Sequence, residues 1–335
     1  MTLRRFLLAI ASLALAVLLI ALLIKVSKID LRVTARQLES VSLLSFTKIV
    51  LLNVLLVYFS SEKWRSIDAA WRRSTDSAPS RMTSFTLTSA GLALGMLLPV
   101  QLAMATARTL GTYVHGRPLK RGTAGTLIEQ GFDLLTVGFL AIASWATWLY
   151  HGGGTMWTLL AISMTAIAFL VVGPAIHAIR WLSAFYNSRG ATPGNRIFRT
   201  FGELQHSAAL NARLASRLVM LSVGRFCVVV LISIETANAI GLQIPLWQMA
   251  ATIPVVIFAS VIALTPGGIG INELAGVGAL TIFGTPMAVA TQWALANRVL
   301  VAASYFFVAI CAALVLGARK LIAASRRDAI SDRPR

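Results

Sequence analysis

The sequence predicts an all-α polytopic membrane protein with about six full spans and two broken or re-entrant helical hairpins, arranged as an inverted repeat. Three observations lead to this fold class: the apolar composition, the length of the apolar runs and the position of the cations. Of the 335 residues, 57% are hydrophobic and 13% are charged. The mean hydropathy of +0.77 lies outside the range of ordinary soluble domains. We therefore expect one integral membrane domain over residues 1–335.

The apolar runs locate the predicted spans. A membrane helix needs about 20 mostly apolar residues. Uninterrupted runs of this kind cover residues 6–24, 41–60, 124–149, 156–179, 218–240 and 287–317. Two further runs, 82–104 and 247–284, contain prolines and glycines that break a helix. The first run follows Arg4 and Arg5 but is long and lacks a small-x-small cleavage site, so it predicts a retained anchor.

The strong positive charge has two interpretations, and the position of the cations chooses between them. The formal net charge of +18 is compatible with nucleic-acid binding. However, the lysines and arginines lie between apolar runs, without an aromatic-basic motif, which favours cytoplasmic loops that contact anionic lipid headgroups. We expect a multi-pass protein of the cell inner membrane, with cytoplasmic termini, a basic cytoplasmic tail over 319–335 and no nucleic-acid partner.

The same cations predict the two hairpins. If every apolar run were a complete span, the basic loop "RTLGTYVHGRPLKR" would face outward and the uncharged turn "HGGG" would face the cytoplasm. Both conflicts disappear if 82–104 turns back to the cytoplasm near Pro99 and 247–284 turns back outward near Pro266. The basic segment 25–36 then remains the one misfit.

Opposed hairpins in the first half, 1–150, and the second half, 156–318, form the pattern of an inverted-repeat transporter. Such transporters place the substrate site at the midplane, where broken helices meet. The alternative is that the two prolines only kink ordinary spans, since proline is common in membrane helices.

The stretch "ALTPGGIGINELAG", residues 263–276, carries the strongest candidate site. Irregular backbone at membrane depth is tolerated where protein or a water-filled cavity satisfies its polar groups. Pro266 ends the preceding helix, while Gly267, Gly268 and Gly270 permit positive φ and leave amides at the start of the next helix. Such amides attract a phosphate or carboxylate headgroup. The alternative is a close helix contact through glycine.

Two ionisable residues accompany the glycines. Glu273 is predicted to accept a substrate cation, to carry a proton, or to cap the glycine amides. Arg298 lies deep in the final run, where its guanidinium suits a phosphate or a carboxylate and where Glu273 is the obvious protein partner. Arg225 and Glu235 are weaker candidates of the same kind.

Two carboxylates lie near the start of the run 124–149. Glu129 and Asp133 are four residues apart and share one helix face. They either share a proton, which suits proton coupling, or pair with a neighbouring arginine such as Arg108. Cys227 and Cys311 lie in apolar runs without metal-type spacing, so we expect packing residues and no disulfide, metal or other cofactor.

The C-terminal third resembles the flippase-like transmembrane family of the lysylphosphatidylglycerol synthases. The resemblance is carried by "ATIPVVIFASVIALTPGGIGINELAGVGALTIFG" and then "ALANRVLVAASYFFVAI". The family pattern is a proline, then G-G-x-G-x-x-E, and later an arginine in the final helix. Weaker similarity covers "SSEKWRSIDAAW", "LLPVQ" and "IEQGFD". Many members have arginine where this chain has Asn272. They also have a Gly-Glu pair and an arginine where this chain has Ala103, Met104 and Ala107. Either Gln101 and Arg108 substitute for these residues, or the substrate differs from that of better known members.

The resemblance implies a protein that moves a lipid with an anionic or amino-acylated headgroup between leaflets. We expect no aminoacyl-transfer domain, because no segment here is long or polar enough. Two alternatives stay open: an integral membrane transferase acting on lipid-linked sugars or phospholipids, and a non-transporting partner subunit of a lipid-biosynthesis enzyme. The expected substrate-binding residues are Pro266, Gly267, Gly268, Gly270, Asn272, Glu273, Arg298, Gln101 and Arg108.

Overall fold

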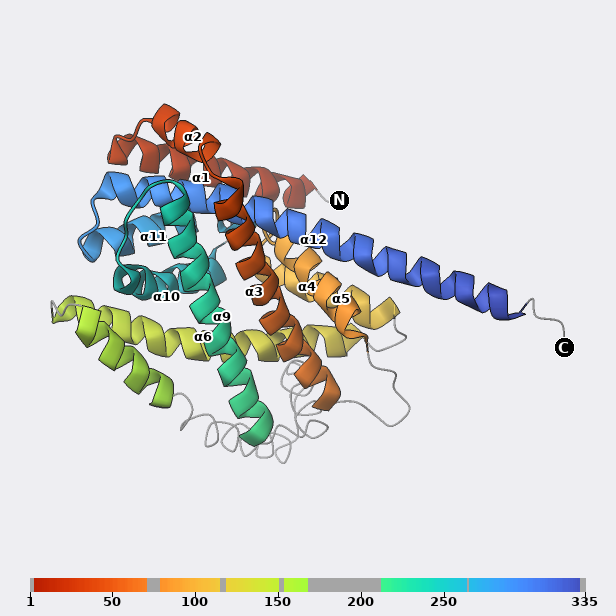
Figure 1. Ribbon diagram of the computed structural model, residues 1–335. Helices are drawn as coiled ribbons and strands as arrows, with labels where there is room; N and C mark the ends of the chain where they lie inside the picture. Colours follow the sequence, from red (N-terminus) through yellow and green to blue (C-terminus); the bar gives the residue numbers. More distant parts are fainter. Residues whose placement is uncertain are drawn as a thin grey trace.

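A computed structural model describes residues 3–70, 79–114, 119–150, 154–167, 212–263 and 265–331. Across these ranges the chain forms helices and no strand, so the predicted all-α polytopic fold is confirmed (Figure 1). The helices are α1 (Leu3–Ser27), α2 (Leu31–Glu39), α3 (Leu43–Ala70), α4 (Arg81–Leu94), α5 (Val100–Val114), α6 (Leu119–Leu149), α9 (Ala212–Ala239), α10 (Leu246–Ile262), α11 (Ile271–Ile282) and α12 (Met287–Ser331), with a short 3₁₀ turn η2 (Pro266–Gly268). A further helix covers Gly154–Ile167.

Four of the described helices are long and apolar enough to cross a membrane: Leu43–Ala70, Gly125–Leu149, Arg213–Ala239 and Met287–Arg319. They correspond to four of the predicted full spans. The predicted run 6–24 lies within α1. The predicted run 156–179 begins in the helix Gly154–Ile167 and then leaves the described residues.

Each of the two interrupted runs forms a pair of short helices separated by a break. In the first pair α4 has 14 residues and α5 has 15. In the second pair α10 has 17 residues and α11 has 12. Helices of this length span about 18–26 Å, less than the hydrocarbon core of about 30 Å. The breaks lie at 95–99 and 263–270, as the predicted interruptions near Pro99 and Pro266 require.

The two breaks contact each other, although they are far apart in sequence. The Gly267 amide donates a hydrogen bond of 3.1 Å to the carbonyl oxygen of Leu98. Gly267 has a φ of +59°, and a Cβ added to it would lie 2.4 Å from the carbonyl oxygen of Met96. Only glycine therefore permits this contact, because a side chain would be strained by the positive φ and would collide with the other break.

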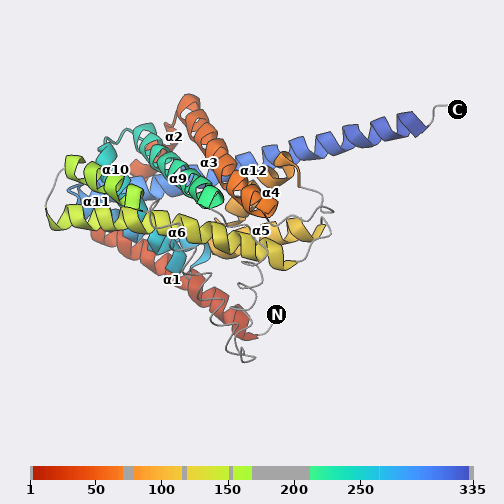
Figure 2. The same cartoon turned by 90° about the horizontal axis from the view of Figure 1, so that it is seen from below.

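The helices of the two halves pack around the α3–α9 contact. These two helices run side by side in both views (Figures 1 and 2). Helix α12 packs on α3 and α4, and helix α6 packs on α9 and α10. One buried apolar cluster joins Leu140 of α6 to Met249 and Val277 of the second half. A second joins Ile49 of α3 to Val228 of α9. The halves thus share their cores.

Two helices extend further than the hydropathy predicts. Helix α3 continues past residue 60 to Ala70, and helix α5 continues past residue 104 to Val114. Lys63 and Arg108, expected in basic cytoplasmic segments, are both 0% exposed. The expectation that they lie in solvated connections was wrong, because hydropathy treats a charge as the end of a span, whereas here carboxylates of another helix compensate it.

The cysteine prediction was also wrong. Cys227 and Cys311 are exposed free thiols and not packing residues. They lie on the exposed faces of α9 and α12. Both helices are long and apolar enough to cross a membrane, so lipid would cover these faces. Helix α12 extends well beyond the rest of the bundle towards the C-terminus (Figure 1).

Candidate functional site

The glycine-rich break forms a tight turn that ends at the start of α11. Gly267, Gly268 and Gly270 all have positive φ, at +59°, +69° and +84°. Glu273, in the first turn of α11, accepts a 2.6 Å hydrogen bond from the Gly270 amide. This is the capping role considered for Glu273 in the sequence, and it satisfies a donor that a helix start leaves open.

Arg298 of α12 connects the break to Glu273. Its Nη2 donates a 2.7 Å hydrogen bond to the carbonyl oxygen of Gly267. Its Nε lies 3.6 Å from Oε1 of Glu273, whose side chain is 4% exposed. The predicted protein pair of Arg298 and Glu273 is therefore present, and the same guanidinium also holds the break in place.

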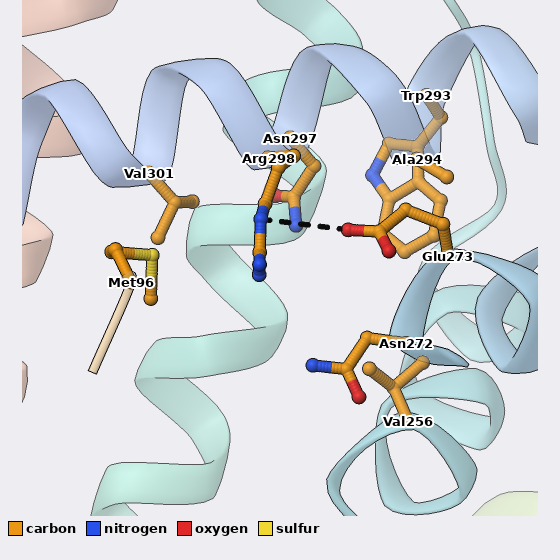
Figure 3. A pocket seen from close by; sticks show the side chains of 9 residues that line it. All are labelled: Met96, Val256, Asn272, Glu273, Trp293, Ala294, Asn297, Arg298 and Val301. Atoms are coloured by element: carbon orange, nitrogen blue, oxygen red, sulfur yellow. Dashed lines mark ion pairs between the residues drawn. The ribbon is translucent and has the colours of Figure 1, made fainter. Parts of the chain in front are cut away.

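A pocket opens beside this pair. It has a water-accessible cavity volume of about 100 Å³ and is lined by Met96, Val256, Asn272, Glu273, Trp293, Ala294, Asn297, Arg298 and Val301. The guanidinium of Arg298 points into it between Met96 and Asn272 (Figure 3). Residues of the first break, α10, α11 and α12 thus surround one polar space. The Trp293 ring is fixed by a 3.1 Å hydrogen bond from its Nε1 to the Ser233 carbonyl oxygen.

The expected role of the glycine amides needs correction. The amides of Gly267, Gly268, Ile269 and Gly270 donate to the Leu98 carbonyl, the Thr265 carbonyl, the Pro266 carbonyl and the Glu273 carboxylate. A donor that already has a protein acceptor does not serve an anion. The break therefore shapes the wall of the pocket, and the amides of these four residues are already in use within the protein.

Helix α1 covers the outer side of the break. It packs against η2, α11 and α12. A Cβ added to Gly270 would lie 2.7 Å from Cβ of Leu19 and 3.2 Å from the carbonyl oxygen of Ala16. This close approach matches the alternative interpretation of the motif, a helix contact through glycine. The close-contact interpretation therefore holds for Gly270.

A second polar cluster lies inside the bundle, away from the pocket. It contains Lys63 of α3, Arg108 of α5, Glu129 and Asp133 of α6, and Ser222 and Arg225 of α9. The side chains of Lys63 and Arg108 are 0% exposed. Three basic side chains face two carboxylates, so the cluster has a formal excess of one positive charge.

Glu129 is held mainly by Arg108. The two groups pair in bidentate fashion, with the second contact, from Nη2 to Oε1, at 3.2 Å. Lys63 Nζ lies 3.7 Å from the same carboxylate. The Arg108 guanidinium also lies over the Trp64 ring, 5.6 Å from its centroid. A cation over a tryptophan face is stabilised by the ring quadrupole.

Asp133 is held by the other two cations. It pairs with Lys63 and accepts 2.8 Å and 2.6 Å hydrogen bonds from Arg225 and Ser222. Arg108 is thus specific to Glu129 and Arg225 to Asp133, while Lys63 lies between the two carboxylates. This is the pairing alternative for Glu129 and Asp133, with Arg108 as the partner named from the sequence.

The structure thus places most of the predicted side chains either at the pocket or in the charged cluster. Asn272, Glu273 and Arg298 line the pocket, and Arg108, Glu129 and Asp133 belong to the charged cluster. Gln101 lies half-buried at the start of α5 and does not line the pocket.

The sequence analysis missed several residues of the pocket and of the charged cluster, or indicated them only weakly. Ser222 was not singled out, while Lys63 and Trp64 entered only as part of the segment "SSEKWRSIDAAW", without a role of their own. Arg225 was a weak candidate, and it binds Asp133, while Glu235 lies 3.7 Å from Lys48. Met96 and Asn297 reach the pocket through tertiary packing, for which the sequence has no local sign.

The family comparison bears on all of these elements. The family model described as the lysylphosphatidylglycerol synthase TM region matches residues 9–312. The chain belongs to this family. The matched part of the chain includes both breaks, the pocket and the charged cluster, and membership indicates a membrane and lipid-related role. A comparison with curated proteins and one with solved structures give no match.

Proposed function

We propose that this protein is a lipid flippase or translocase, which moves a phospholipid or a lipid-linked intermediate with a charged headgroup between leaflets. The observation that carries the proposal is the contact between two helix breaks beside a polar pocket. The Gly267 amide reaches the Leu98 carbonyl at 3.1 Å, and Arg298 and Glu273 line the adjoining space. An ion pair inside membrane helices is expensive and by default functional.

The packing supports an inverted repeat of two re-entrant pairs. The helices α3, α4, α5 and α6 of the first half correspond in order to α9, α10, α11 and α12 of the second half. Under this correspondence the contact of α12 with α4 has its counterpart in the contact of α6 with α10. Both contacts are present. The same correspondence relates the contact of α12 with α3 to that of α6 with α9. Transporters with this symmetry bind substrate where their broken helices meet.

The ion pairs follow the same correspondence. Arg108 of α5 pairs with Glu129 of α6, and Glu273 of α11 pairs with Arg298 of α12. In each half a pair therefore joins the second short helix to the next long helix, with the signs reversed. This correspondence supports related roles for the two pairs in holding the short helices.

In the proposed mechanism Arg298 binds the phosphate of the headgroup. Its guanidinium points into the pocket and suits phosphate oxygens. Glu273 keeps the guanidinium and the Gly270 amide in position. Apolar lining from Met96, Val256 and Val301 contacts the part of the lipid next to the headgroup. Lipids are thus the proposed main partners, and a lipid-biosynthesis enzyme would supply them.

The proposed location is the cell inner membrane, with both termini in the cytoplasm. The support is the distribution of the 30 lysines and arginines, most of which this orientation places on one side. The basic residues at that side would contact anionic headgroups of the cytoplasmic leaflet.

The test is lipid movement in vesicles reconstituted with the purified protein. Fluorescent phospholipids and a polyprenyl phosphate are followed by quenching from outside, with empty vesicles as the background. Arg298→Gln and Glu273→Gln are compared with Arg32→Gln and Glu39→Gln, whose side chains are exposed on α2. A hydrogen bond to a charged group contributes about 1.5–3 kcal/mol, so we expect Arg298→Gln to slow movement roughly 10- to 100-fold.

The outcomes separate the candidate functions. Wild-type rates equal to those of empty vesicles for every lipid would overturn the proposal, as would equal rates for Arg298→Gln and Arg32→Gln. A covalently changed lipid recovered from the same vesicles would instead support the membrane transferase.

A further inference from the structure

Four charged side chains form a group near the end of α3. Glu62, whose side chain is 9% exposed, lies beside guanidinium groups that come from three helices. Arg65 of α3 donates a hydrogen bond to its carboxylate. The nearest nitrogens of Arg81 of α4 and Arg217 of α9 lie 3.9 Å and 3.6 Å from the same carboxylate. We call these four residues the arginine site, and none of them lines the pocket or belongs to the charged cluster.

The arginine site has positive charge that its carboxylate does not compensate. Three arginines face one glutamate, which leaves a formal excess of two positive charges among these four side chains. At 3.9 Å and 3.6 Å, Arg81 and Arg217 are beyond ordinary hydrogen-bond length, so Glu62 does not use their donors. Their side chains are 80% and 59% exposed. Glu62 thus gathers the three guanidinium groups without neutralising them.

The arginine site lies at the level expected for lipid headgroups. From Leu43 to Glu62, α3 rises about 28 Å, which is close to the thickness of the hydrocarbon core, about 30 Å. The start of α9 lies at the same end of the bundle as the end of α3, where Ile67 and Leu218 share a buried cluster (Figure 1). In the proposed orientation this end faces the cytoplasm.

We propose that Arg65, Arg81 and Arg217 bind the phosphate groups of an anionic phospholipid of the cytoplasmic leaflet. A phospholipid with two phosphates, such as cardiolipin, matches the formal excess of two charges. The planar guanidinium group binds phosphate oxygens in pairs, and basic pockets between membrane helices suit such headgroups. The bound lipid joins the start of α4, in the first short helix pair, to α9 of the second half. The inference rests on the proposed orientation and not on lipid movement.

The experiment measures the binding of fluorescent cardiolipin to the purified protein in detergent. An arginine near an anionic headgroup contributes about fivefold in affinity, which corresponds to about 1 kcal/mol. The double variant Arg81→Gln, Arg217→Gln should therefore bind cardiolipin roughly 25-fold more weakly than the wild type. The matched control is Arg213→Gln, Arg319→Gln, which removes two exposed arginines outside the arginine site and should change the affinity only slightly. Equal losses in the two double variants would show a diffuse attraction to basic surface and would overturn the proposal.

A second measurement needs no variant. Cardiolipin should raise the melting temperature of the wild-type protein above its value in phosphatidylcholine, since a ligand stabilises the state that it binds. The rise should shrink as salt is added, because the arginines are exposed. Pyrophosphate, which is also multiply charged but has no acyl chains, should give a smaller rise. No rise with cardiolipin would overturn the proposal, and an equal rise with pyrophosphate would overturn it in favour of a soluble anion.

The failure of this proposal differs from the failure of the proposed function. A loss of cardiolipin binding in Arg298→Gln as large as that in Arg81→Gln, Arg217→Gln would place the lipid in the pocket, which overturns the arginine site alone. Cardiolipin binding that depends on the arginine site, together with no lipid movement above the background of empty vesicles, would support the site and overturn the translocase.

Discussion

Glu129→Gln tests the charge balance of the buried cluster most directly. The substitution keeps the size of the side chain and removes one of the two carboxylates that face Lys63, Arg108 and Arg225. Three buried cations then share Asp133. Breaking a buried pair in this way costs about 3–5 kcal/mol, because the remaining charge stays desolvated without its partner.

Arg108→Met in the same background should restore part of the loss. The double variant leaves Lys63 and Arg225 with Asp133, which is the same excess of one positive charge as in the wild type. Replacing both members of a buried pair with groups of similar size is often close to neutral. We therefore expect the double variant to lie about 2 kcal/mol above Glu129→Gln in stability, a coupling typical of contacting residues.

The assay is thermal unfolding of the purified protein in detergent, followed by tryptophan fluorescence. With about 2 °C for each kcal/mol, Glu129→Gln should lower the melting temperature by about 6–10 °C and the double variant by clearly less. Glu39→Gln on the exposed face of α2 is the control and should change little. A double variant as unstable as Glu129→Gln, or a Glu129→Gln melting temperature equal to wild type, would refute the charge-balance reasoning.

Two further substitutions probe the break and the pocket wall. Gly267→Ala should abolish lipid movement and lower stability by about 1–3 kcal/mol, because its positive φ strains any side chain and its Cβ would collide with Met96. Gly278→Ala, with open space around its Cβ, should be neutral or stabilising by up to about 1 kcal/mol in unfolding, and a loss as large as that of Gly267→Ala would contradict the steric argument. Trp293→Phe removes the hydrogen bond to the Ser233 carbonyl and should cost about 1 kcal/mol in thermal unfolding, whereas an unchanged melting temperature would show that the bond adds nothing.

The positions of the breaks could be predicted because their causes are local. Proline removes a backbone donor and glycine permits positive φ, and both effects act within a few residues of Pro99 and Pro266. The Arg298 and Glu273 pair was predictable because a charge in an apolar run needs a partner, and the run offers few.

The rest depends on tertiary contacts that no local pattern records. The glycine amides look free in the sequence, yet Gly267 donates to Leu98 across more than half of the chain. Lys63 looks like a loop residue until α6 places Asp133 beside it. Asn297 stands beside the predicted Arg298 in sequence, but only the approach of α11 to α12 shows that it also lines the pocket.

The hydrogen bond from Gly267 to Leu98 also constrains the order of assembly. The chain is synthesised from its N-terminus, so the break at 95–99 is made long before residue 267 exists. Until then the Leu98 carbonyl lacks the partner that it has in the finished protein. A polar backbone group left without a partner in lipid costs several kcal/mol. With the break at membrane depth, α4 and α5 would therefore complete their hydrogen bonding only after residue 267 is inserted.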